Sequence, residues 1–340
     1  MRYIGIDVHK RISTYCVLND AGKIELERDG VPTTAEGFQE LMEYAAPRGC
    51  RILIENSTRS HFVYHLFAEA GYDIIAAHAV DLAAIAKSKV KNDRIDAYRL
   101  AQYLMRRDRG EVQFSVSNIT SRENMRRRAL CRLCADMVRM KTDMVRRARE
   151  YMSLHDVRLP PHYASIDSKR SLRALYARND PVLTHMLAFV EMMNQRIESL
   201  EEDIVKEFGE DDDVRLLVSI PGMGVKTAAT TVAAVDGIER FDSAQKLVSY
   251  LGVDPVSRES AGKRRPGRIS KDGDPLVRYM LNNVVMNHVR HCPQSAVTAF
   301  FHRLRARMDH RRAVTATVRK IVCVIWALLT RREPFRAMSC

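Results

Sequence analysis

The sequence predicts an α/β domain built on a mixed sheet, then a helical coiled-coil arm, then a mostly helical C-terminal domain. Three observations support this fold class. Short apolar runs alternate with amphipathic stretches over the first 110 residues, a long basic stretch with an apolar stripe follows, and Gly-rich turns separate apolar helices near the C-terminus. A chain of 340 residues is long enough for separate cores. We expect domains at 1–115, 116–210 and 211–340.

The N-terminal domain contains five short strand candidates, at residues 3–8, 14–18, 23–28, 51–55 and 72–76. Helices are expected at 33–46, 61–70 and 92–107. A capping box of Thr33 and Glu36 would open the first, and Gly71 would end the second. Three strands in succession, followed by strand–helix alternation, describe a mixed sheet with helices on its faces. This is the ribonuclease-H arrangement, in which acidic residues from strand ends and a late helix converge at one edge.

Four acidic residues occupy the positions that a metal-dependent nuclease would need: Asp7, Glu55, Asp93 and Asp96. Asp7 and Glu55 each end an apolar run, and Asp93 and Asp96 share one face of a helical turn. Clustered carboxylates repel one another and lose hydration, so cations normally stabilise such a cluster. Oxygen ligands favour Mg²⁺ or Mn²⁺. Asp7 would bridge two ions, and Glu55 and Asp96 would complete the coordination shells of these ions. Asp93 would either bind an ion or adjust the electrostatics beside them.

The arm is predicted from two long helices, 121–151 and 181–208, joined by a bend at Leu159-Pro160-Pro161. The second helix has near-heptad apolar spacing, which favours an antiparallel coiled coil that is often a dimer surface. The same periodicity fits two helices that pack on their own domain. The first helix carries an apolar stripe formed by Leu130, Leu133, Met137, Met140 and Met144.

A Gly-rich turn, Ser219–Gly224, joins two helical segments of the C-terminal domain in a helix-hairpin-helix-like arrangement. Such turns present backbone N–H groups to a phosphate, or they serve only as structural turns. The spacing is not that of a P-loop, so ATP binding is not predicted. Helices at 241–251, 275–291 and 311–330 follow, and the apolar run 321–329 is too short to cross a bilayer.

A flexible loop is predicted at 257–273, and it concentrates positive charge in Arg258, Lys263, Arg264, Arg265, Arg268 and Lys271. This composition predicts a phosphate-binding surface. Ser260 lies within it, and a serine hydroxyl attacks phosphate only when a base, a metal or a cationic surround activates it. The basic side chains would stabilise the charge that develops on the phosphorus. By composition alone Ser260 does not differ from Ser257 or Ser270, and an ordinary loop serine is the alternative.

The composition indicates a polyanionic partner. The chain has 55 Lys+Arg against 42 Asp+Glu, a net charge of +13, and only 7% aromatic residues. We therefore expect contacts to a nucleic-acid backbone by arginine rather than ranks of stacked bases. Seven scattered cysteines fit reduced thiols in a cytoplasm, and Cys131 and Cys134 are expected as buried helix thiols rather than zinc ligands. No signal peptide and no membrane are expected.

Several strings resemble the DEDD-motif insertion-sequence transposases, the IS-one-ten family with its IS-eleven-eleven branch, described as bridge-RNA-guided serine recombinases. The resemblance extends over nearly the whole chain, in order. The strings are Ile4-Gly5-Ile6-Asp7-Val8-His9-Lys10, Ile54-Glu55-Asn56-Ser57-Thr58, Lys91-Asn92-Asp93-Arg94-Ile95-Asp96-Ala97, Ser219-Ile220-Pro221-Gly222-Met223-Gly224, Tyr250-Leu251-Gly252-Val253-Asp254-Pro255, Arg258-Glu259-Ser260, Ile269-Ser270-Lys271-Asp272-Gly273, and Arg278.

The resemblance implies a resolvase-like (RuvC-like) DEDD domain, a coiled-coil arm and a C-terminal domain with a nucleophilic serine. The four acids map to Asp7, Glu55, Asp93 and Asp96, and the serine maps to Ser260. It further implies a dimer that assembles into a tetramer with a composite site, a structured noncoding guide RNA that pairs with donor and target DNA, and a location in the cytoplasm with the nucleoid.

Two positions depart from the family pattern: Thr58-Arg59 replaces small residues after Glu55, and Ala261 separates Ser260 from Gly262. The enzyme alternative is a Holliday-junction-type nuclease in which water attacks the phosphate. A third alternative is a nucleic-acid-binding protein with a degenerate nuclease fold. A sugar-kinase or actin-like ATPase is excluded because Val8-His9-Lys10 lacks the Gly and Thr of that phosphate-binding turn. We expect His9 to be a surface or packed histidine, outside the catalytic set.

Overall fold

The computed structural model describes residues 1–78, 93–159, 165–260 and 263–336, with the backbone alone described for 256–260 and 263–268. Within this chain there are two compact units, Met1–Arg122 and Glu123–Cys340. The long helical pair and the C-terminal helices belong to the same unit. Each unit is described by itself.

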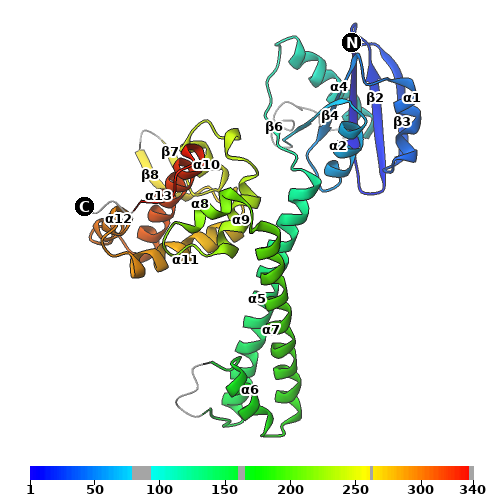
Figure 1. Ribbon diagram of the computed structural model, residues 1–340. Coiled ribbons are helices and arrows are strands. Elements are labelled where there is room, and N and C mark those ends of the chain that lie inside the picture. The colour runs from blue at the N-terminus through cyan, green and yellow to red at the C-terminus, as the bar shows by residue number, and fades with distance from the viewer. Residues whose placement is uncertain (79–92, 160–164, 261–262, 337–340) are drawn as a thin grey trace. The chain divides into compact units, whose positions relative to one another are not determined.

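The first unit is built on one mixed six-stranded sheet with strand order β3-β2-β1-β4-β5-β6 (Figure 1). The central strand β1 pairs antiparallel with β2 and parallel with β4. The predicted mixed α/β architecture is therefore confirmed, whereas the last strand was not predicted. The strands are β1 (Arg2–Val8), β2 (Ile12–Leu18), β3 (Ile24–Pro32), β4 (Cys50–Glu55), β5 (Asp73–Ala77) and β6 (Val116–Ser117).

Helices cover both faces of this sheet because side chains alternate along each strand. Ile4 and Ile54 pack in one core cluster with Phe67 of α2 (Ser60–Glu69). Tyr3 and Leu53, on the opposite face, pack with α4 (Asp93–Asp108). This face also carries Asp7 and Glu55 at the strand ends, so the two-residue period places both acids under α4.

The predicted capping box at Thr33 is not formed. The Thr33 hydroxyl donates to the His9 carbonyl at 3.0 Å and contacts Ser13 at 2.8 Å, which ties it to the neighbouring strand. Thr34 takes the capping role instead, and its hydroxyl accepts from the N–H of Gly37 at 3.2 Å. The helical segment is shorter than predicted: a 3₁₀ turn, η1 (Glu36–Phe38), and the short helix α1 (Gln39–Tyr44) replace the expected 33–46.

Gly5 lies where α4 crosses β1 at closest approach. A Cβ atom at this position would lie 2.1 Å from the Ala97 carbonyl oxygen and 2.5 Å from the Ala101 nitrogen. Both are backbone atoms of α4, so neither can rotate away. Only glycine allows the helix to lie this close to the strand. The contact therefore fixes the height of the first turn of α4 above the end of β1.

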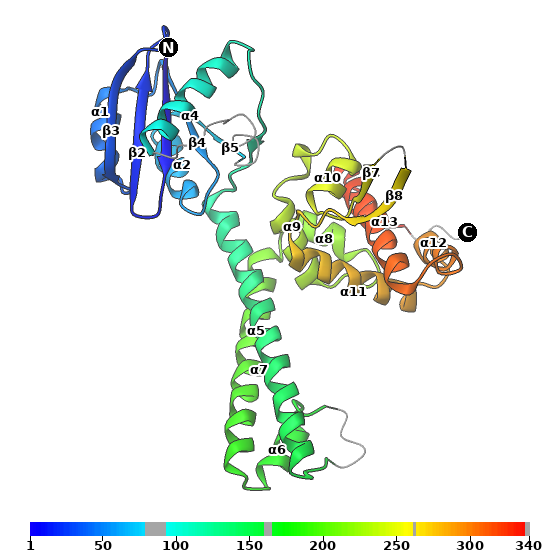
Figure 2. The same ribbon diagram turned by 180° about the vertical axis from the view of Figure 1, so that it is seen from behind.

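In the second unit the antiparallel helices α5 (Arg122–Leu154) and α7 (Pro181–Phe208) lie side by side (Figures 1 and 2). Val145 and Ala148 of α5 pack with Leu183 and Leu187 of α7 in one buried cluster. The bounds of α7 agree with the sequence prediction. The predicted bend carries an additional helix, α6 (Lys169–Tyr176), while residues 160 and 161 of the proline pair lie outside the described part of the chain.

The apolar stripe predicted on α5 is only partly packed. Met144 packs against the cluster shared with α7 and Leu130 packs against the C-terminal core, whereas Leu133 and Met140 are 47% and 54% exposed. Cys131 and Cys134 are buried instead, in a core cluster shared with Ile204 and the C-terminal helices. Burial raises the pKa of both thiols. They are therefore helix-core thiols, as predicted, and this end of the helical pair packs on its own domain.

The C-terminal helices surround α13, whose Ile321 and Ile325 are fully buried. By length and composition α13 is the one helix in the described ranges that could cross a membrane. From the sequence, membrane crossing was judged on the apolar run 321–329 alone, which is shorter than this helix. Half of its apolar window is buried in the protein, as expected for a core helix. The elements are α8 (Asp212–Val218), α9 (Val225–Val235), η2 (Ile238–Arg240), α10 (Ala244–Tyr250), β7 (Pro255–Ser260), β8 (Lys263–Ile269), α11 (Pro275–His291), α12 (Ala296–Arg305) and α13 (His310–Arg331).

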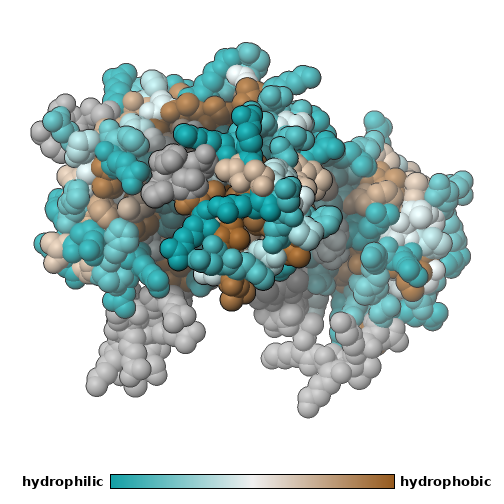
Figure 3. All heavy atoms as spheres, turned by 90° about the horizontal axis from the view of Figure 1, so that it is seen from below, coloured by the Kyte–Doolittle hydropathy of each residue, from teal (hydrophilic) through white to brown (hydrophobic). Residues whose placement is uncertain are grey.

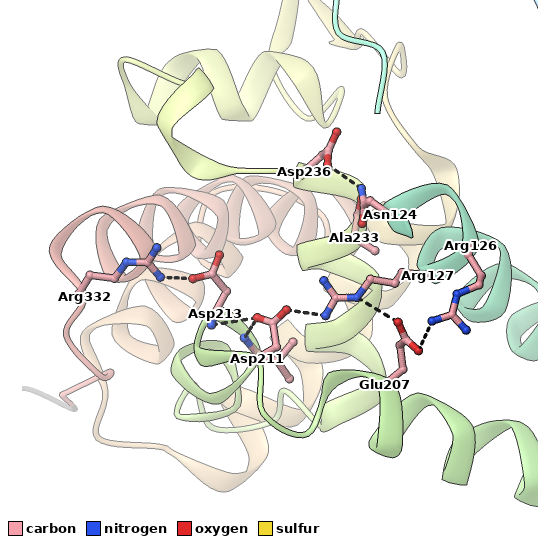
Figure 4. A network of polar contacts seen from close by, with 10 residues as sticks. Asn124, Arg126, Arg127, Glu207, Asp211, Asp213, Ala233, Asp236 and Arg332 are labelled. Atoms are coloured by element: carbon pink, nitrogen blue, oxygen red, sulfur yellow. Dashed lines mark hydrogen bonds and ion pairs between the residues drawn. The ribbon is translucent and has the colours of Figure 1, made fainter. Parts of the chain in front are cut away.

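Polar contacts fix the first turns of α5 to the C-terminal helices (Figure 4). The Asn124 amide donates to the Ala233 carbonyl at 3.0 Å and to Asp236 at 2.7 Å. Arg127 pairs with Asp211 at 2.6 Å, and its guanidinium lies 4.0 Å from the centre of the Phe208 ring. These contacts are partly buried, so they align α5 with the domain more strongly than exposed ion pairs would, although the Nε of Arg127 is buried without a hydrogen bond.

Replacing Gly5 with Ala should separate α4 from β1. We expect a loss of about 2–4 kcal/mol in the stability of the first unit, because the backbone of α4 must move. Hydrogen–deuterium exchange should show faster exchange in α4 and β1 and unchanged exchange in α13. Gly224→Ala is the control, because its φ is −81° and no atom lies within 4 Å of the added Cβ. Unchanged protection of α4 in Gly5→Ala would contradict this explanation.

Candidate functional site

Asp7 and Glu55 lie side by side at the ends of two parallel strands. Ile6 pairs with Ile54 in the parallel register, so the next residue on each strand is an acid. Parallel strands in register present paired residues on the same face. Both carboxylates therefore belong to the face that α4 covers, as the sequence predicted for a convergent edge.

The first turn of α4 adds Asp93 and Asp96 to this edge. His9, just after β1, lies between the elements: its Nε2 is 3.3 Å from Asp7 Oδ2 and 3.6 Å from Asp93 Oδ1. One ligand atom from each of Asp7, His9 and Asp93 lies within 4.8 Å of the others. Asp96 accepts from Arg99 Nη1 at 3.4 Å. Of the predicted acids, Asp7 and Asp93 thus meet most closely in the described residues.

The pKa of Asp7 reflects the other three acids. It is raised from 3.8 to about 6, chiefly by burial; His9 lowers it, and the negative charges of Asp93, Asp96 and Glu55 contribute to the rise. The Asp7 side chain is only 15% exposed, so water screens this repulsion incompletely. The position of Asp7 at the sheet edge therefore destabilises its ionised form.

The donor set fits a divalent cation. Asp7 is partly desolvated and surrounded by carboxylates, and a cation would reverse the repulsion that raises its pKa. The acidic oxygens suit Mg²⁺ or Mn²⁺, whereas the imidazole of His9 suits Mn²⁺ better than Mg²⁺. Asp7 and Asp93, with His9 beside them, are the residues that could hold such an ion, and Glu55 and Asp96 lie within electrostatic reach.

The sequence did not predict that His9 contacts the acidic residues. It was expected to be a surface or packed histidine, and its side chain is indeed 48% exposed, yet it contacts two of the acids. Its position two residues after a strand-end acid was the available signal. That signal was weak, because the turn that brings His9 back toward Asp93 depends on a tertiary contact and not on local sequence.

An ion pair outside the acidic edge orients the first turn of α4. Arg94 Nε lies 3.0 Å from Asp29 Oδ2 on β3, and the other oxygen of Asp29 accepts from the Thr14 hydroxyl at 2.8 Å. Thr14 is the register partner of Asp7 on β2. The pair therefore links the start of α4 to the strand beside Asp7, and together with the Gly5 contact it determines where Asp93 lies.

Ser260 belongs to a β-hairpin and not to the flexible loop that was predicted. The strands β7 and β8 pair antiparallel, with Ser260 opposite Lys263 and Arg258 opposite Arg265. Ser260 therefore lies at the end of the ladder, next to residues 261 and 262, which lie outside the described part of the chain. Arg264 and Arg268 also lie on β8, so the backbone brings the predicted serine and five of the six predicted basic residues to one hairpin, and Lys271 follows two residues after it.

The base of this hairpin is closed by backbone contacts that only glycine permits. Gly252 has φ +66°, and a Cβ there would lie 2.6 Å from the Gly273 nitrogen. A Cβ on Gly273 would lie 2.3 Å from the Tyr250 carbonyl oxygen. Arg278 Nη1 donates to the carbonyls of Gly273 at 2.5 Å and Leu251 at 3.2 Å. The two ends of the hairpin are thus held together by the first turn of α11.

A second pair of bonds continues this closure toward the strands. The Ser270 hydroxyl donates to Asp254 at 2.5 Å, and the Ser270 N–H donates to the Asp254 carbonyl at 3.1 Å. Ser270 therefore has a structural partner. Lys271, predicted to bind nucleic acid, is exposed and has φ +63° beside this closure.

The Gly-rich turn between α8 and α9 is packed against α11. Gly222 has φ +90°, and a Cβ there would lie 2.7 Å from the His288 nitrogen. His288 is fully buried, and burial lowers its pKa, so the ring is neutral. Its Nδ1 donates to the Pro221 carbonyl at 2.9 Å, because a carbonyl can only accept. These contacts explain Gly222 by packing and leave phosphate binding by the turn as a prediction.

Comparison with known sequences finds one transposase profile over the sheet edge and another over the C-terminal hairpin region. A profile of DEDD transposases of the IS110 type matches residues 4–155, and a profile described as "Transposase IS116/IS110/IS902 family" matches residues 214–300. Together they extend over well more than half of the chain. The sheet edge and the helical C-terminal part thus define a transposase of the DEDD class. The chain belongs to the IS110/IS116 family of insertion-sequence transposases.

Two relatives match most of the chain at low identity. The transposase for insertion sequence element IS1111A of Coxiella burnetii is 24% identical over 99% of this chain and 92% of its own length. The transposase for IS1328 of Yersinia enterocolitica is 21% identical over 84% of this chain and 85% of its own length. Family membership implies an enzyme that binds DNA and cleaves or transfers strands.

Asp7→Asn should stabilise the metal-free protein at neutral pH. The folded state raises the pKa of Asp7 from 3.8 to about 6, so wild type loses stability as pH rises between about 4 and 6 and remains lower above it. A shift of this size corresponds to about 2–3 kcal/mol. Thermal unfolding at pH 7.5 should show a higher Tm for Asp7→Asn in chelator, and the increase in Tm that we expect Mg²⁺ to give wild type should be lost. A lower Tm in chelator would contradict the cluster.

Arg278→Ala should open the base of the hairpin. Losing two charge-assisted bonds to carbonyls should cost about 2–3 kcal/mol locally. Hydrogen–deuterium exchange of the amides of Ser270 and Lys271 should become faster, because both bond across the base. Arg290→Ala on the same helix is the matched control, since Arg290 is exposed. Equal exchange in both variants would show that Arg278 does not hold the hairpin.

Proposed function

We propose that this protein is an RNA-guided DNA transposase that cleaves and exchanges strands through a covalent phosphoserine intermediate at Ser260. The observation that carries the proposal is the convergence of acids from β1, β4 and the first turn of α4 on one edge of a mixed sheet. This edge is the catalytic edge of a ribonuclease-H or RuvC-like domain in our proposal. Its acids act on DNA phosphates rather than as a solvated surface.

Asp7, Glu55, Asp93 and Asp96 would hold Mg²⁺ or Mn²⁺. Bound metal would supply positive charge at the reacting phosphate. Asp7 serves as the central ligand because its side chain is less exposed than those of Asp93 and Asp96 and because the other carboxylates act on its pKa. Asp93 approaches it from the helix, and His9 contacts both. The Arg94–Asp29 pair keeps the first turn of α4 in place while the substrate binds.

Ser260 would act as the nucleophile. Its Oγ forms a bond to phosphorus, the bond from phosphorus to one deoxyribose oxygen breaks, and the released hydroxyl takes up a proton. The hydroxyl of a second DNA end then attacks the phosphoserine, joins the two DNA ends and returns the serine hydroxyl. The ester conserves the bond, so exchange needs no ATP.

The hairpin supports this role by its register. Arg258 and Arg265 occupy opposed positions next to Ser260, and like charges at opposed positions destabilise a pair of strands. A phosphate backbone would remove that repulsion. Arg258, Lys263, Arg264, Arg265, Arg268 and Lys271 are therefore our proposed nucleic-acid contacts, and they would stabilise the charge on the phosphorus.

The proposed partners are donor DNA, target DNA and a structured noncoding guide RNA. Base pairing to the RNA supplies the sequence choice, and the protein binds shape and backbone. A homodimer that assembles into a tetramer would bring the carboxylates of one protomer and Ser260 of another to the same phosphate. The support is the resemblance of the motifs together with the strong positive charge of the chain.

The second candidate is a nuclease of the Holliday-junction type, in which water attacks and Ser260 is idle. It is kept because the acidic edge alone is sufficient for hydrolysis. The third, a nucleic-acid-binding protein without activity, requires the acids to be idle as well. The elevated pKa of Asp7 argues against it, because an idle cluster would retain an electrostatic cost with no role.

A covalent-adduct assay separates these candidates. The protein is incubated with DNA of its locus, the flanking transcripts and Mg²⁺, and resolved on a denaturing gel. We expect a protein–DNA adduct in wild type that is lost in Ser260→Ala and in Asp7→Ala. Ser257→Ala is the matched control on the same strand and should retain the adduct. DNA cleavage that survives Ser260→Ala, with no adduct in wild type, would exclude the serine nucleophile.

A further inference from the structure

The segment between α12 and α13 is unusually rich in basic residues. Residues 302–312, here called the arginine turn, contain five arginines, two histidines and one acid, Asp309. All five arginines are exposed. Neither the acidic edge nor the serine hairpin uses this segment, and it lies outside the basic set considered so far.

The turn has a defined conformation. The Asp309 side chain accepts from the N–H of Arg312 at 3.1 Å and caps α13. Arg305 Nη1 donates to the Met308 carbonyl at 3.1 Å, so one arginine closes the turn on itself. Below it, the ring of Phe301 is buried and meets the ring of His310 edge-on, with centroids 5.9 Å apart. The remaining arginines are therefore presented from a fixed backbone.

Three of these arginines are not neutralised by the protein. In the part of the chain that the structure describes, no acidic side chain forms an ion pair with Arg303, Arg307 or Arg311. Many other exposed arginines are paired, such as Arg28 with Glu40 and Arg215 with Asp212. The positive charge of these three side chains is thus exposed and has no acidic partner among the described residues.

The local helix disfavours one of these charges. Arg311 and Arg312 lie in the first turn of α13, where the helix macrodipole is positive and acidic residues are stabilising. Arg312 gains an ion pair there, with its Nε 3.2 Å from Asp309 Oδ2, whereas Arg311 has no acidic partner among the described residues, so fold stability gives no reason for an arginine at position 311. Residues that oppose a local folding rule without a local gain are expected where function requires them.

The residue types indicate phosphate as the ligand. The turn contains no lysine, and the planar guanidinium binds phosphate oxygens in a bidentate manner that the ammonium group cannot reproduce. The aromatic ring just before the turn, Phe301, is buried and is not available to stack on bases. Contacts would thus be made to the sugar–phosphate backbone, without selection of sequence.

Seen from below, the molecule shows mostly hydrophilic side chains with hydrophobic ones in small patches (Figure 3). Exposed basic residues are therefore common, and exposure alone selects no site. What singles out the arginine turn is the combination of a fixed backbone, three guanidinium groups without an ion pair in the described residues and, for Arg311, an unfavourable helix position.

We propose that the arginine turn binds the phosphodiester backbone of a nucleic acid through Arg303, Arg307 and Arg311. The inference rests on the proposed function only in that the substrate is nucleic acid; it requires neither the carboxylates nor Ser260. DNA and RNA share this chemistry, and the experiment below distinguishes them.

The test compares two triple variants with wild type. The first is Arg303→Gln, Arg307→Gln and Arg311→Gln. The second, Arg28→Gln, Arg158→Gln and Arg215→Gln, removes the same charge from arginines that are already ion-paired. Fluorescence anisotropy gives Kd for a DNA duplex and for an RNA hairpin at a series of salt concentrations. Each lost phosphate contact should reduce the slope of log K against log salt by about 0.9 for duplex DNA and about 0.7 for single strands.

We expect the turn variant to bind at least one of the two nucleic acids about tenfold more weakly at low salt, with a slope reduced by about two to three. The paired-arginine variant should retain the wild-type slope. A change with DNA alone assigns the turn to donor or target, and a change with RNA alone assigns it to the guide. Equal slopes for wild type and both variants, with both nucleic acids, would overturn the proposal.

Protection from chemical modification supplies a readout on wild type that does not depend on how the variants fold. Phenylglyoxal modifies exposed arginines, and mass spectrometry locates the products. Arg303, Arg307 and Arg311 should be protected by bound nucleic acid, whereas Arg28 should not; equal modification with and without nucleic acid contradicts the proposal. The adduct assay tests a separate claim. An adduct without protection would contradict only the proposal for the arginine turn, and protection without an adduct would contradict only the serine chemistry.

Discussion

The approach of α4 to β1 at Gly5 is the constraint on which the acidic edge depends. The helix backbone lies so close that a Cβ would overlap the Ala97 carbonyl, and this closeness brings the first turn of α4 to the end of the strand. Asp93 then lies within reach of His9 and Asp7. Without that contact the strand-end acids would face solvent as ordinary surface groups, and the pKa of Asp7 would have no reason to rise to about 6.

The second unit uses the same physical device at its own site. Gly252 and Gly273 let two backbone segments touch at the base of the β7–β8 hairpin, and Arg278 fastens them. Gly222 does the same between the turn after α8 and the buried backbone of α11. In each unit, therefore, glycines let two backbone segments touch beside residues that we propose for the site, and a phosphoryl-transfer site would require such precise placement.

Much of this architecture could be predicted because its signals are local. Alternating apolar runs located β1 to β5, and the near-heptad apolar spacing located α7 to the residue. The acids at strand ends followed from the same pattern. Features decided by distant contacts were missed: Thr33 bonds to a strand instead of capping a helix, and His9 turns back to Asp93. The hairpin at Ser260 was mistaken for a loop, because its many charged residues hide the pairing, and α12 was not predicted.

The central claim is that the sheet edge binds a divalent cation through carboxylates from three elements. Electron paramagnetic resonance of Mn²⁺ titrated into the protein tests it most directly, because free and bound ions give different signals. We predict bound Mn²⁺ that Mg²⁺ displaces, and binding at least tenfold weaker in Glu55→Gln and in Asp96→Asn. Equal binding by wild type and both variants, or no bound Mn²⁺ at millimolar concentration, would contradict the account.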